Sequence, residues 1–337
     1  MASCIAVDAM GGDDAPDAVV AGAIQAVRHT EREVNILLVG PEDAIQGVLD
    51  DHPEAPTERF EIVDAPDVIG MGESPSTAVK QKPASSIHKG LAAHHDELAD
   101  AFVSAGNTGA IMGAAMFILG RISGVKRPSI AGFFPNLKGS SVVMDIGSNV
   151  DCKPEHLVQF ARMGTIYARK ALGNDDPTVG LLNIGEEPGK GNGLVKTAYD
   201  RLQELPEIHF KGNVEGGDLL FYAADIIICD GFVGNALLKF GESMSPVIDK
   251  MAEQEMERQS LNEEEKALVT RVLSDVRKHF DAESLGGVPL LGVDGNVLVG
   301  HGSSSPAVIE QMIHTASSIA DTDIVSAIEA AFQSEAA

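Results

Sequence analysis

The chain has 337 residues, of which 44% are hydrophobic and 35 are glycine, a composition typical of a glycine-rich α/β protein. Its formal net charge of −25 and its lack of tryptophan argue against nucleic-acid binding, which needs basic surfaces and aromatic stacking platforms. Because the carboxylates are spread along the whole chain, the charge favours adaptation to a salty cytoplasm over an acidic interaction tail.

Apolar runs with strand character alternate with segments of helical period along most of the chain. The predicted strands are, in chain order, 4–8, 34–39, 60–63, 101–104, 130–134, 141–145, 179–183, 208–211, 226–229, 288–293 and 297–300. Helical periods are clearest over 17–29, 108–121, 154–172, 193–205 and 306–320. Alternation of this kind predicts a parallel sheet with right-handed crossovers.

One segment, from residue 234 to about 280, contains no strand-like run. Two helices are predicted there, over 237–259 and 262–280, with Asn262 as the N-cap of the second and Glu265 three residues later. We expect residues 234–285 to form a helical hairpin that serves as a dimer or partner surface. A membrane-touching tip is the weaker alternative, because this stretch is rich in glutamate.

The cysteines and the N-terminus indicate the compartment. Cys4, Cys152 and Cys229 form no C-x-x-C pair and are odd in number, which favours reduced, buried thiols. The chain enters a strand directly, without a basic flank or cleavage site, and no apolar stretch approaches the ~20 residues that span a bilayer. These features predict a soluble cytoplasmic protein.

Six glycine-centred clusters stand at the ends of apolar runs, and most of them precede a helical segment. They cover residues 7–13, 104–109, 145–149, 183–192, 229–235 and 301–304. The carboxyl ends of parallel strands meet at one edge of a sheet, where helix N-termini bind anionic ligands. The clusters therefore predict a phosphate or oxyanion site at that edge.

The cluster at 183–192 looks like a phosphate loop but has the wrong spacing for G-x-x-x-x-G-K-[ST]. Three residues separate Gly185 from Gly189, and Gly191 follows Lys190. Lys190 lies among glycines at a predicted helix start, where its ammonium group and backbone N–H groups could hold an anion. A solvated lysine in a turn explains the same pattern equally well.

Other clusters also have structural explanations. Asn107 and Thr108 suit the N-cap of the helix at 108–121, and Asp145 could orient a ligand or simply end a turn. His301 could act as an acid, a base or an anion ligand, or it could be structural. The sequence contains no G-x-S-x-G, H-E-x-x-H or G-x-G-x-x-G. We therefore expect an enzyme that works by positioning and electrostatics, without metal or cofactor.

The longest of these sequence motifs resemble those of the bacterial phosphate acyltransferases of phospholipid synthesis, the acyl-[acyl-carrier-protein]:phosphate acyltransferases. The resemblance runs in order along nearly the whole chain, through 5–16, 104–110, 149–154, 182–192, 212–216, 229–235, 286–292 and 301–304. It implies one catalytic domain over 1–337 with a three-layer α/β/α fold, related to phosphotransacetylases and isocitrate/isopropylmalate dehydrogenases. It also implies a cytoplasmic homodimer that associates with the inner face of the membrane, near the glycerol-phosphate acyltransferase that takes its product.

The reaction that the resemblance implies is attack of inorganic phosphate on the thioester of a long-chain acyl-carrier protein, with no covalent enzyme intermediate. Two residues depart from the family pattern. Asp14 stands where the family usually has histidine, which puts a catalytic histidine there in doubt. Lys80 stands where arginine is common, so a bidentate grip on phosphate is lost.

Roles in this reaction are assigned to residues of all six clusters. Lys190, Asn235 and His301 are the predicted catalytic residues, with Lys190 stabilising the oxyanion. Predicted substrate- and phosphate-binding residues are Asp8, Gly11, Gly12, Gly106, Asn107, Thr108, Asp145, Asn149, Gly185, Gly191, Asn192, Gly234 and Ser303. Because acyl-carrier proteins are acidic, the basic residues at 121, 126 and 127 are the predicted landing area for the carrier.

Three rival functions fit parts of the sequence. A phosphotransacylase that uses short acyl-coenzyme A is the nearest. A nicotinamide-dependent β-decarboxylating dehydrogenase would need a carboxylate-bound divalent metal and substrate-binding arginines, and no such constellation is evident. A non-enzymatic scaffold for lipid synthesis would leave the glycine clusters without a purpose.

Overall fold

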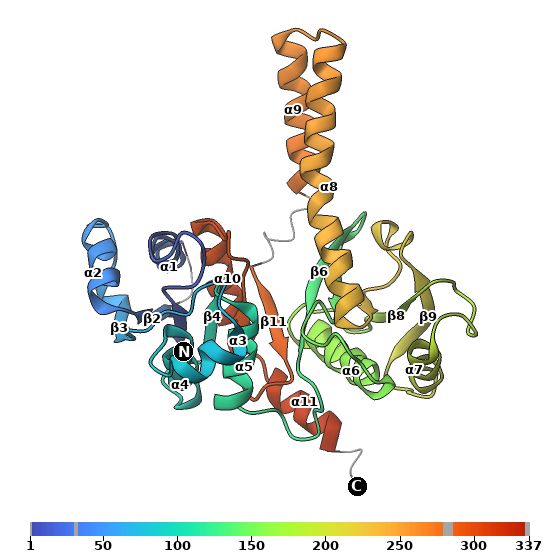
Figure 1. Cartoon of the computed structure of the whole chain (residues 1–337), viewed down its shortest axis with the longest axis horizontal. Helices are drawn as coiled ribbons and strands as arrows, with labels where there is room; N and C mark the ends of the chain where they lie inside the picture. Colours follow the sequence, from blue (N-terminus) through green and yellow to red (C-terminus); the bar gives the residue numbers. More distant parts are fainter. Residues whose placement is uncertain (1, 30–32, 279–285, 334–337) are drawn as a thin grey trace. The chain divides into compact units, whose positions relative to one another are not determined.

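The computed structural model describes residues 2–29, 33–278 and 286–333 (Figure 1). Contacts divide the chain into two compact units. The first comprises Met1–Ala131, Ile166–Asp175 and Leu285–Ala337, and the second comprises Gly132–Thr165 and Asp176–Ser284. Each unit has its own sheet, whereas the sequence predicts one sheet. Apolar runs identify strands, but they do not say which strands pair. That 1–337 folds as one cooperative domain stays a prediction.

The first unit is built on a seven-stranded sheet. Its strands, from one edge to the other, are β3 (Phe60–Asp64), β2 (Val34–Gly40), β1 (Ser3–Asp8), β4 (Ala101–Ser104), β12 (Val297–Val299), β11 (Val288–Leu291) and β5 (Ser129–Ile130). All neighbours are parallel except β11, which is antiparallel to both β12 and β5. The central strands are buried nearly throughout, which is why they read as continuous apolar runs.

Helices cover both faces of this sheet. On one face α1 (Asp17–Arg28) packs closely on α10 (Pro306–Ala320), because Gly22 leaves room for Ile309. On the other face α4 (Ser86–His95) and α5 (Thr108–Ile118) pack together, and Gly90 leaves room for Phe102. The helical periods predict α1, α5 and α10. The other helices of this unit, α4, α2 (Glu42–Asp50), α3 (Pro75–Gln81) and α11 (Ile324–Gln333), are not among the clearest helical periods.

The second unit is built on a five-stranded sheet. Its order is β6 (Gly132–Asn136), β7 (Gly139–Met144), β10 (Ile226–Ile228), β8 (Thr178–Asn183) and β9 (His209–Glu215), with only β6 antiparallel. Helix α6 (Pro154–Lys170) begins in this unit, and α7 (Gly193–Gln203) packs Tyr199 edge-on against Phe210 of β9. The predicted strand 130–134 is wrong, because the run divides at Ala131 into β5 and β6, which belong to different sheets.

The hairpin of the second unit is confirmed as α8 (Gly231–Arg258) and α9 (Glu263–Lys278) (Figure 1). Helix α8 begins at Gly231 rather than at 237, because the side chain of Asp230 caps its first turn. The predicted cap of the second helix is confirmed: Asn262 N donates to Glu265 Oε2 over 2.9 Å, and Glu265 N donates to Asn262 Oδ1 over 3.0 Å. Residues 279–280 of that predicted helix lie outside the described residues.

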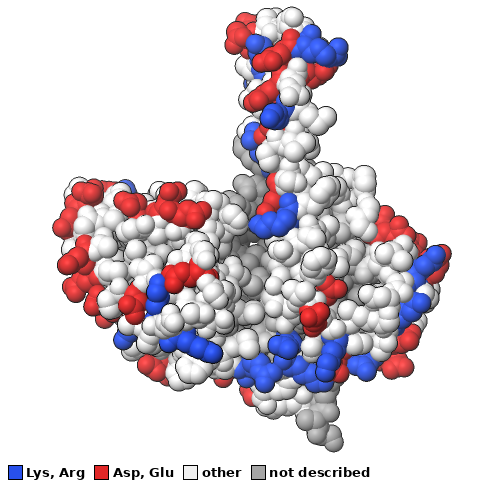
Figure 2. Space-filling model, in the orientation of Figure 1, with Lys and Arg blue, Asp and Glu red and all other residues white. Residues whose placement is uncertain are grey.

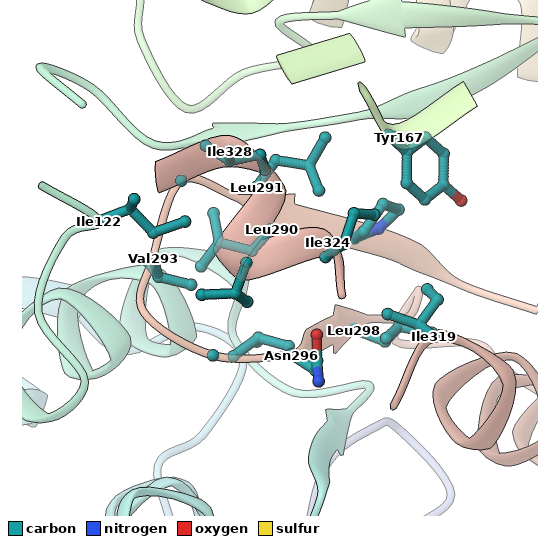
Figure 3. Close-up of a pocket in the computed structure, with 15 residues that line it drawn as sticks. Ile122, Tyr167, Leu290, Leu291, Val293, Asn296, Leu298, Ile319, Ile324 and Ile328 are labelled. Atoms are coloured by element: carbon teal, nitrogen blue, oxygen red, sulfur yellow. The ribbon is translucent and has the colours of Figure 1, made fainter. Parts of the chain in front are cut away.

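A small cavity of about 10 Å³ lies in the first unit, beside α11 and the turn between β11 and β12. Figure 3 shows that mostly apolar side chains line it, among them Leu290, Ile324 and Ile328. It has room for about one water molecule and is too small for an acyl group or phosphate. None of the predicted site residues lines it.

Candidate functional site

Three glycine clusters meet at one edge of the first unit's sheet. They follow the adjacent strands β1, β4 and β12. The chain runs from β1 to β2 on one side of β1, and the later strand β4 lies on the other side of β1. A backbone hydrogen bond joins the cluster at 7–13 to the cluster at 301–304, because Asp13 N donates to Gly302 O over 2.8 Å. Ligands of open α/β sheets bind where strand order reverses in this way, so this edge is one candidate site.

Asp8 is buried at the centre of this edge and has protein partners. Its carboxylate accepts from Ser104 Oγ over 2.6 Å and from Met10 N over 3.2 Å, and Gly106 N donates to Ser104 Oγ over 3.0 Å. A Cβ added to Gly11 would lie 2.8 Å from Gly106 N and 2.9 Å from Asp8 Oδ2, so only glycine fits there. Asp8 thus ties the turns after β1 and β4 together, and Ser104 is a functional candidate that sequence reasoning missed.

We expect Asp8→Asn to gain stability relative to the wild type as pH rises from about 4 to neutral. Burial raises the pKa of Asp8 above its ordinary 3.8, against opposing hydrogen bonds from Ser104, Ser86 and Met10. The folded chain therefore holds this proton more tightly than the unfolded chain, and the free energy of unfolding falls as pH rises through that window. Urea unfolding of both chains at several pH values measures the difference, and a relative loss with rising pH would contradict the assignment.

Asn107 is confirmed as the N-cap of α5 and is fully used in that role. Its Oδ1 accepts from Ala110 N over 3.1 Å, while its Nδ2 donates to the carbonyl oxygens of Gly70, Met71 and Glu73 over 3.0 to 3.3 Å. The side chain therefore holds the loop before α3 against the start of α5. Nothing in the local sequence signals this pairing, since 34 to 37 residues separate the partners.

Three further predicted residues of this edge, Thr108, His301 and Ser303, are exposed, whereas Gly12 is partly buried and Gly106 is buried. Thr108 is exposed at the start of α5. His301 Nδ1 lies 2.8 Å from Ser303 Oγ and 3.3 Å from Ser303 N, so this pair forms a local turn at the end of β12. His301 is thus available to a ligand or to solvent.

In the second unit, Asp145 organises the turn after β7. Its carboxylate accepts from Ser148 N and Oγ over 3.1 and 2.7 Å, and from Asn149 N and Nδ2 over 2.5 and 2.9 Å. Gly231 N donates to Asn149 O over 2.9 Å, which fixes the start of α8 against this turn. A Cβ at Gly234 would overlap with Asp145 O, so glycine is required. Asp145 is fully buried and therefore positions the turn.

Asn235 lies beside the same turn, because a Cβ on Gly147 would be 3.5 Å from its Oδ1. The structure thus brings Asp145, Asn149, Gly234 and Asn235 together, as the sequence predicts for clusters at neighbouring strand ends. Asp230, which caps α8, was missed, although an aspartate directly before a helix is a recognisable N-cap signal.

The Lys190 loop follows β8, on the other side of β10 from that turn. Asn183 Nδ2 donates to Lys190 O over 3.2 Å, and Asn192 Oδ1 caps α7 by accepting from Val195 N over 3.0 Å. Asn213 of β9, which sequence reasoning missed, donates to Glu187 O over 2.9 Å. The Lys190 side chain is half exposed, and its Nζ lies 3.8 Å from Glu187 Oε2, so its ammonium group remains open to an anion.

One expectation about the site is corrected. The six clusters lie at two sheet edges, three in each unit, because β1, β4 and β12 belong to one sheet and β7, β8 and β10 to the other. The predicted landing area at 121–127 follows the C-terminal end of α5, whereas the site residues lie at its start. It therefore lies at the opposite end of α5 from Asn107, and its role as a landing area stays a prediction. Within the described ranges no group of three or more His, Cys, Asp or Glu side chains could hold a metal.

Known proteins are similar to this chain over almost its whole length. A family model described as "Fatty acid synthesis protein" matches residues 3–327. A phosphate acyltransferase from Salinibacter ruber is 71% identical over 336 residues, which cover 100% of this chain and 99% of that protein. A phosphate acyltransferase from Chlorobaculum parvum is 48% identical over 320 residues, covering 93% and 94%.

Solved structures confirm the fold class. A branched-chain phosphotransacylase from Enterococcus faecalis superposes with a TM-score of 0.60 at 13% identity, over 96% of this chain and 100% of that one. The EutD phosphotransacetylase from Staphylococcus aureus gives a TM-score of 0.59 at 14% identity, over 95% and 94%. At such identities the likeness shows the fold alone, an α/β fold of mostly parallel sheets with helices on both sides.

Proposed function

We infer the reaction from one premise: this chain belongs to the phosphate acyltransferase family, and it is an acyltransferase. We propose that it transfers a long-chain acyl group from acyl-carrier protein to inorganic phosphate, which yields acyl phosphate for phospholipid synthesis. The observation that carries this proposal is the 71% identity, over the full chain, to a protein named phosphate acyltransferase.

The proposed step is a direct acyl transfer. A phosphate oxygen attacks the thioester carbonyl carbon, and the carbonyl electron pair moves to oxygen to give a tetrahedral oxyanion. When this oxyanion collapses, the C–S bond breaks, and the carrier thiolate leaves and takes up a proton. Lys190 is half exposed in a loop of glycines, so its ammonium group can offset the combined negative charge of phosphate and oxyanion. Asn235 and His301 are the further proposed catalytic residues.

Two thiols of the chain are poor alternatives to phosphate as nucleophile. Burial raises the pKa of Cys4 to about 11, with help from the nearby Asp100 and Glu61 carboxylates. Burial, with the charges of Asp230 and Asp145, also raises the pKa of Cys229 well above 9. Because the thiolate is the reactive form, the raised pKa of each thiol disfavours nucleophilic attack by it near neutral pH. This supports direct attack over a thioester on either of these cysteines.

The test is formation of acyl phosphate by the full chain from inorganic phosphate, trapped as the hydroxamate. Long-chain acyl-carrier protein and acetyl-coenzyme A are compared as donors. We expect product with the carrier-bound donor and little with acetyl-coenzyme A. Preference for acetyl-coenzyme A would favour a short-chain phosphotransacylase, and product from neither donor would overturn the proposal.

We expect kcat/KM for the carrier-bound donor to rise with added salt. The chain carries a net charge of −25, and Figure 2 shows carboxylates gathered over α2, so an acidic carrier is repelled at low ionic strength. Raising salt from about 0.15 M to about 1 M shortens the Debye length from about 8 Å to about 3 Å and removes this repulsion. Initial rates across a salt series measure the effect, and a steady fall with salt would contradict it.

We also propose that the protein is a cytoplasmic homodimer joined through the hairpin and resting on the inner face of the membrane beside a membrane acyltransferase. Support comes from large apolar side chains that are at least half exposed or nearly so along both hairpin helices: Phe240, Val247, Ile248, Met251, Leu268, Val272 and Val276. Contiguous exposed apolar surface marks an interface. Sedimentation at twice the mass of one chain tests the dimer. In the part of the chain that the structure describes, none of the helices combines the length and the apolar character of a membrane span.

A further inference from the structure

Three large apolar side chains are exposed at the carboxyl edge of the second unit's sheet. Val150 is 58% exposed, Ile184 is 82% exposed and Phe232 is 66% exposed. Each one adjoins a glycine or asparagine of the candidate site in the sequence. They belong to neither helix cap: the Asp230 side chain caps α8, and the Asn192 side chain caps α7. Their exposure therefore has no explanation in local structure.

The fold brings these three residues to neighbouring positions. Strand β10 lies between β7 and β8, with Ile228 beside Met144 on one side and beside Leu181 on the other. The hydrogen bond from Gly231 N to Asn149 O, 2.9 Å long, places the backbone of Phe232 next to that of Val150. Strand β8 ends at Asn183, directly before Ile184, and β10 ends at Ile228, three residues before α8 begins at Gly231, so both segments leave the sheet at the same ends of adjacent strands.

The resulting surface combines apolar and anion-binding groups. Ile184 begins the loop that carries Lys190, and Phe232 stands in the first turn of α8, three residues before Asn235. Exposed apolar residues that are grouped around polar ones mark ligand sites in soluble proteins. An amphiphile with an anionic head and a hydrocarbon tail matches this combination. A pantetheine arm fits less well, because its amides would find no polar partner on these three side chains.

We propose that Val150, Ile184 and Phe232 form an apolar rim that binds the acyl chain next to Lys190. This inference deepens the proposed function, since it takes the acyl donor and acyl phosphate as the ligands. The rim favours long acyl chains because the buried contact area grows with chain length. Each fully buried methylene contributes about 0.8 kcal/mol, or about fourfold in affinity.

The test measures binding of octyl, dodecyl and hexadecyl phosphate and of inorganic phosphate to the full chain, below the micelle concentration of each. These probes mimic acyl phosphate but do not hydrolyse, so the measurement does not need turnover. We expect Phe232→Ala to bind dodecyl phosphate about tenfold more weakly and inorganic phosphate within about twofold of the wild type. Ile184→Ala should act in the same direction.

Matched controls lie at the opposite side of the same sheet from the carboxyl ends of its parallel strands. Phe221 is 72% exposed and Leu137 is 71% exposed, and the bond from Leu137 N to Leu220 O places both next to the β6–β7 turn. Phe221→Ala and Leu137→Ala should leave every affinity unchanged. All four substitutions are at exposed positions, so none should impair folding.

A loss in Phe232→Ala that grows with chain length supports the rim. An equal loss for all four probes, no loss, or an equal loss in Phe221→Ala overturns it. The outcome is separable from the proposed function: chain-length-dependent binding without any acyl-phosphate formation would preserve the rim and reject the reaction. Acyl-phosphate formation with an unchanged chain-length preference in Phe232→Ala would preserve the reaction and reject the rim.

Discussion

Lys190→Ala should lower turnover by ~10² or more while leaving the folded state intact. The lysine side chain is half exposed, and its ion pair with Glu187 is loose at 3.8 Å, so its removal costs the fold little. In the proposed reaction, however, negative charge develops on the thioester carbonyl oxygen beside a phosphate that is itself an anion. Removing the ammonium group that offsets both charges should therefore act on kcat, measured as acyl-phosphate formation under saturating substrate.

Lys239→Ala is the matched control for this prediction. Lys239 is 53% exposed against 50% for Lys190, lies in the same unit, and also pairs with a glutamate three residues away. It carries the same charge but follows no strand end, so its removal should leave turnover unchanged. Comparable losses in both variants would point to a general effect of net charge. Near-normal turnover in Lys190→Ala would remove Lys190 from the mechanism.

Asp145→Asn should cost about 2–4 kcal/mol of the free energy of unfolding and nearly all activity. The buried carboxylate accepts four hydrogen bonds from Ser148 and Asn149, and an amide at this position would direct an N–H donor at existing donors. The turn also supports the start of α8 through the bond from Gly231 to Asn149 O. Urea unfolding gives the stability, and assays below the unfolding transition give the activity of the folded fraction.

Asp225→Asn separates stability from function. The Asp225 carboxylate also accepts several hydrogen bonds, from Thr178 N and Oγ1 and from Tyr222 OH, but at the opposite end of β8 from the Lys190 loop. This variant should lose stability yet keep turnover in the folded fraction. If Asp145→Asn lost less than about 0.5 kcal/mol, the organising role of Asp145 would be wrong.

Local sequence patterns predicted much of this molecule because their physical causes are local. A continuous apolar run is what a strand buried on both faces requires, so strands such as β1 and β2 are placed within one residue. The reciprocal cap of Asn262 and Glu265 spans four residues and was predicted in full. The glycine clusters identified strand ends because the turn that follows a strand is also a local feature. The residue motifs in these clusters identified the family.

The pairing of strands and of distant side chains was decided only by the tertiary structure. The run at 130–134 has uniform apolar character, yet β5 and β6 join different sheets. Ile130 of β5 pairs with Leu290, which lies far away in the chain, whereas β6 pairs with the next strand, β7. The bonds from Ser104 to Asp8 and from Asn213 to Glu187 likewise close loops of 96 and 26 residues. A sequence by itself determines where strands end and which residue types stand there. Which of those ends become neighbours depends on packing that no local pattern records.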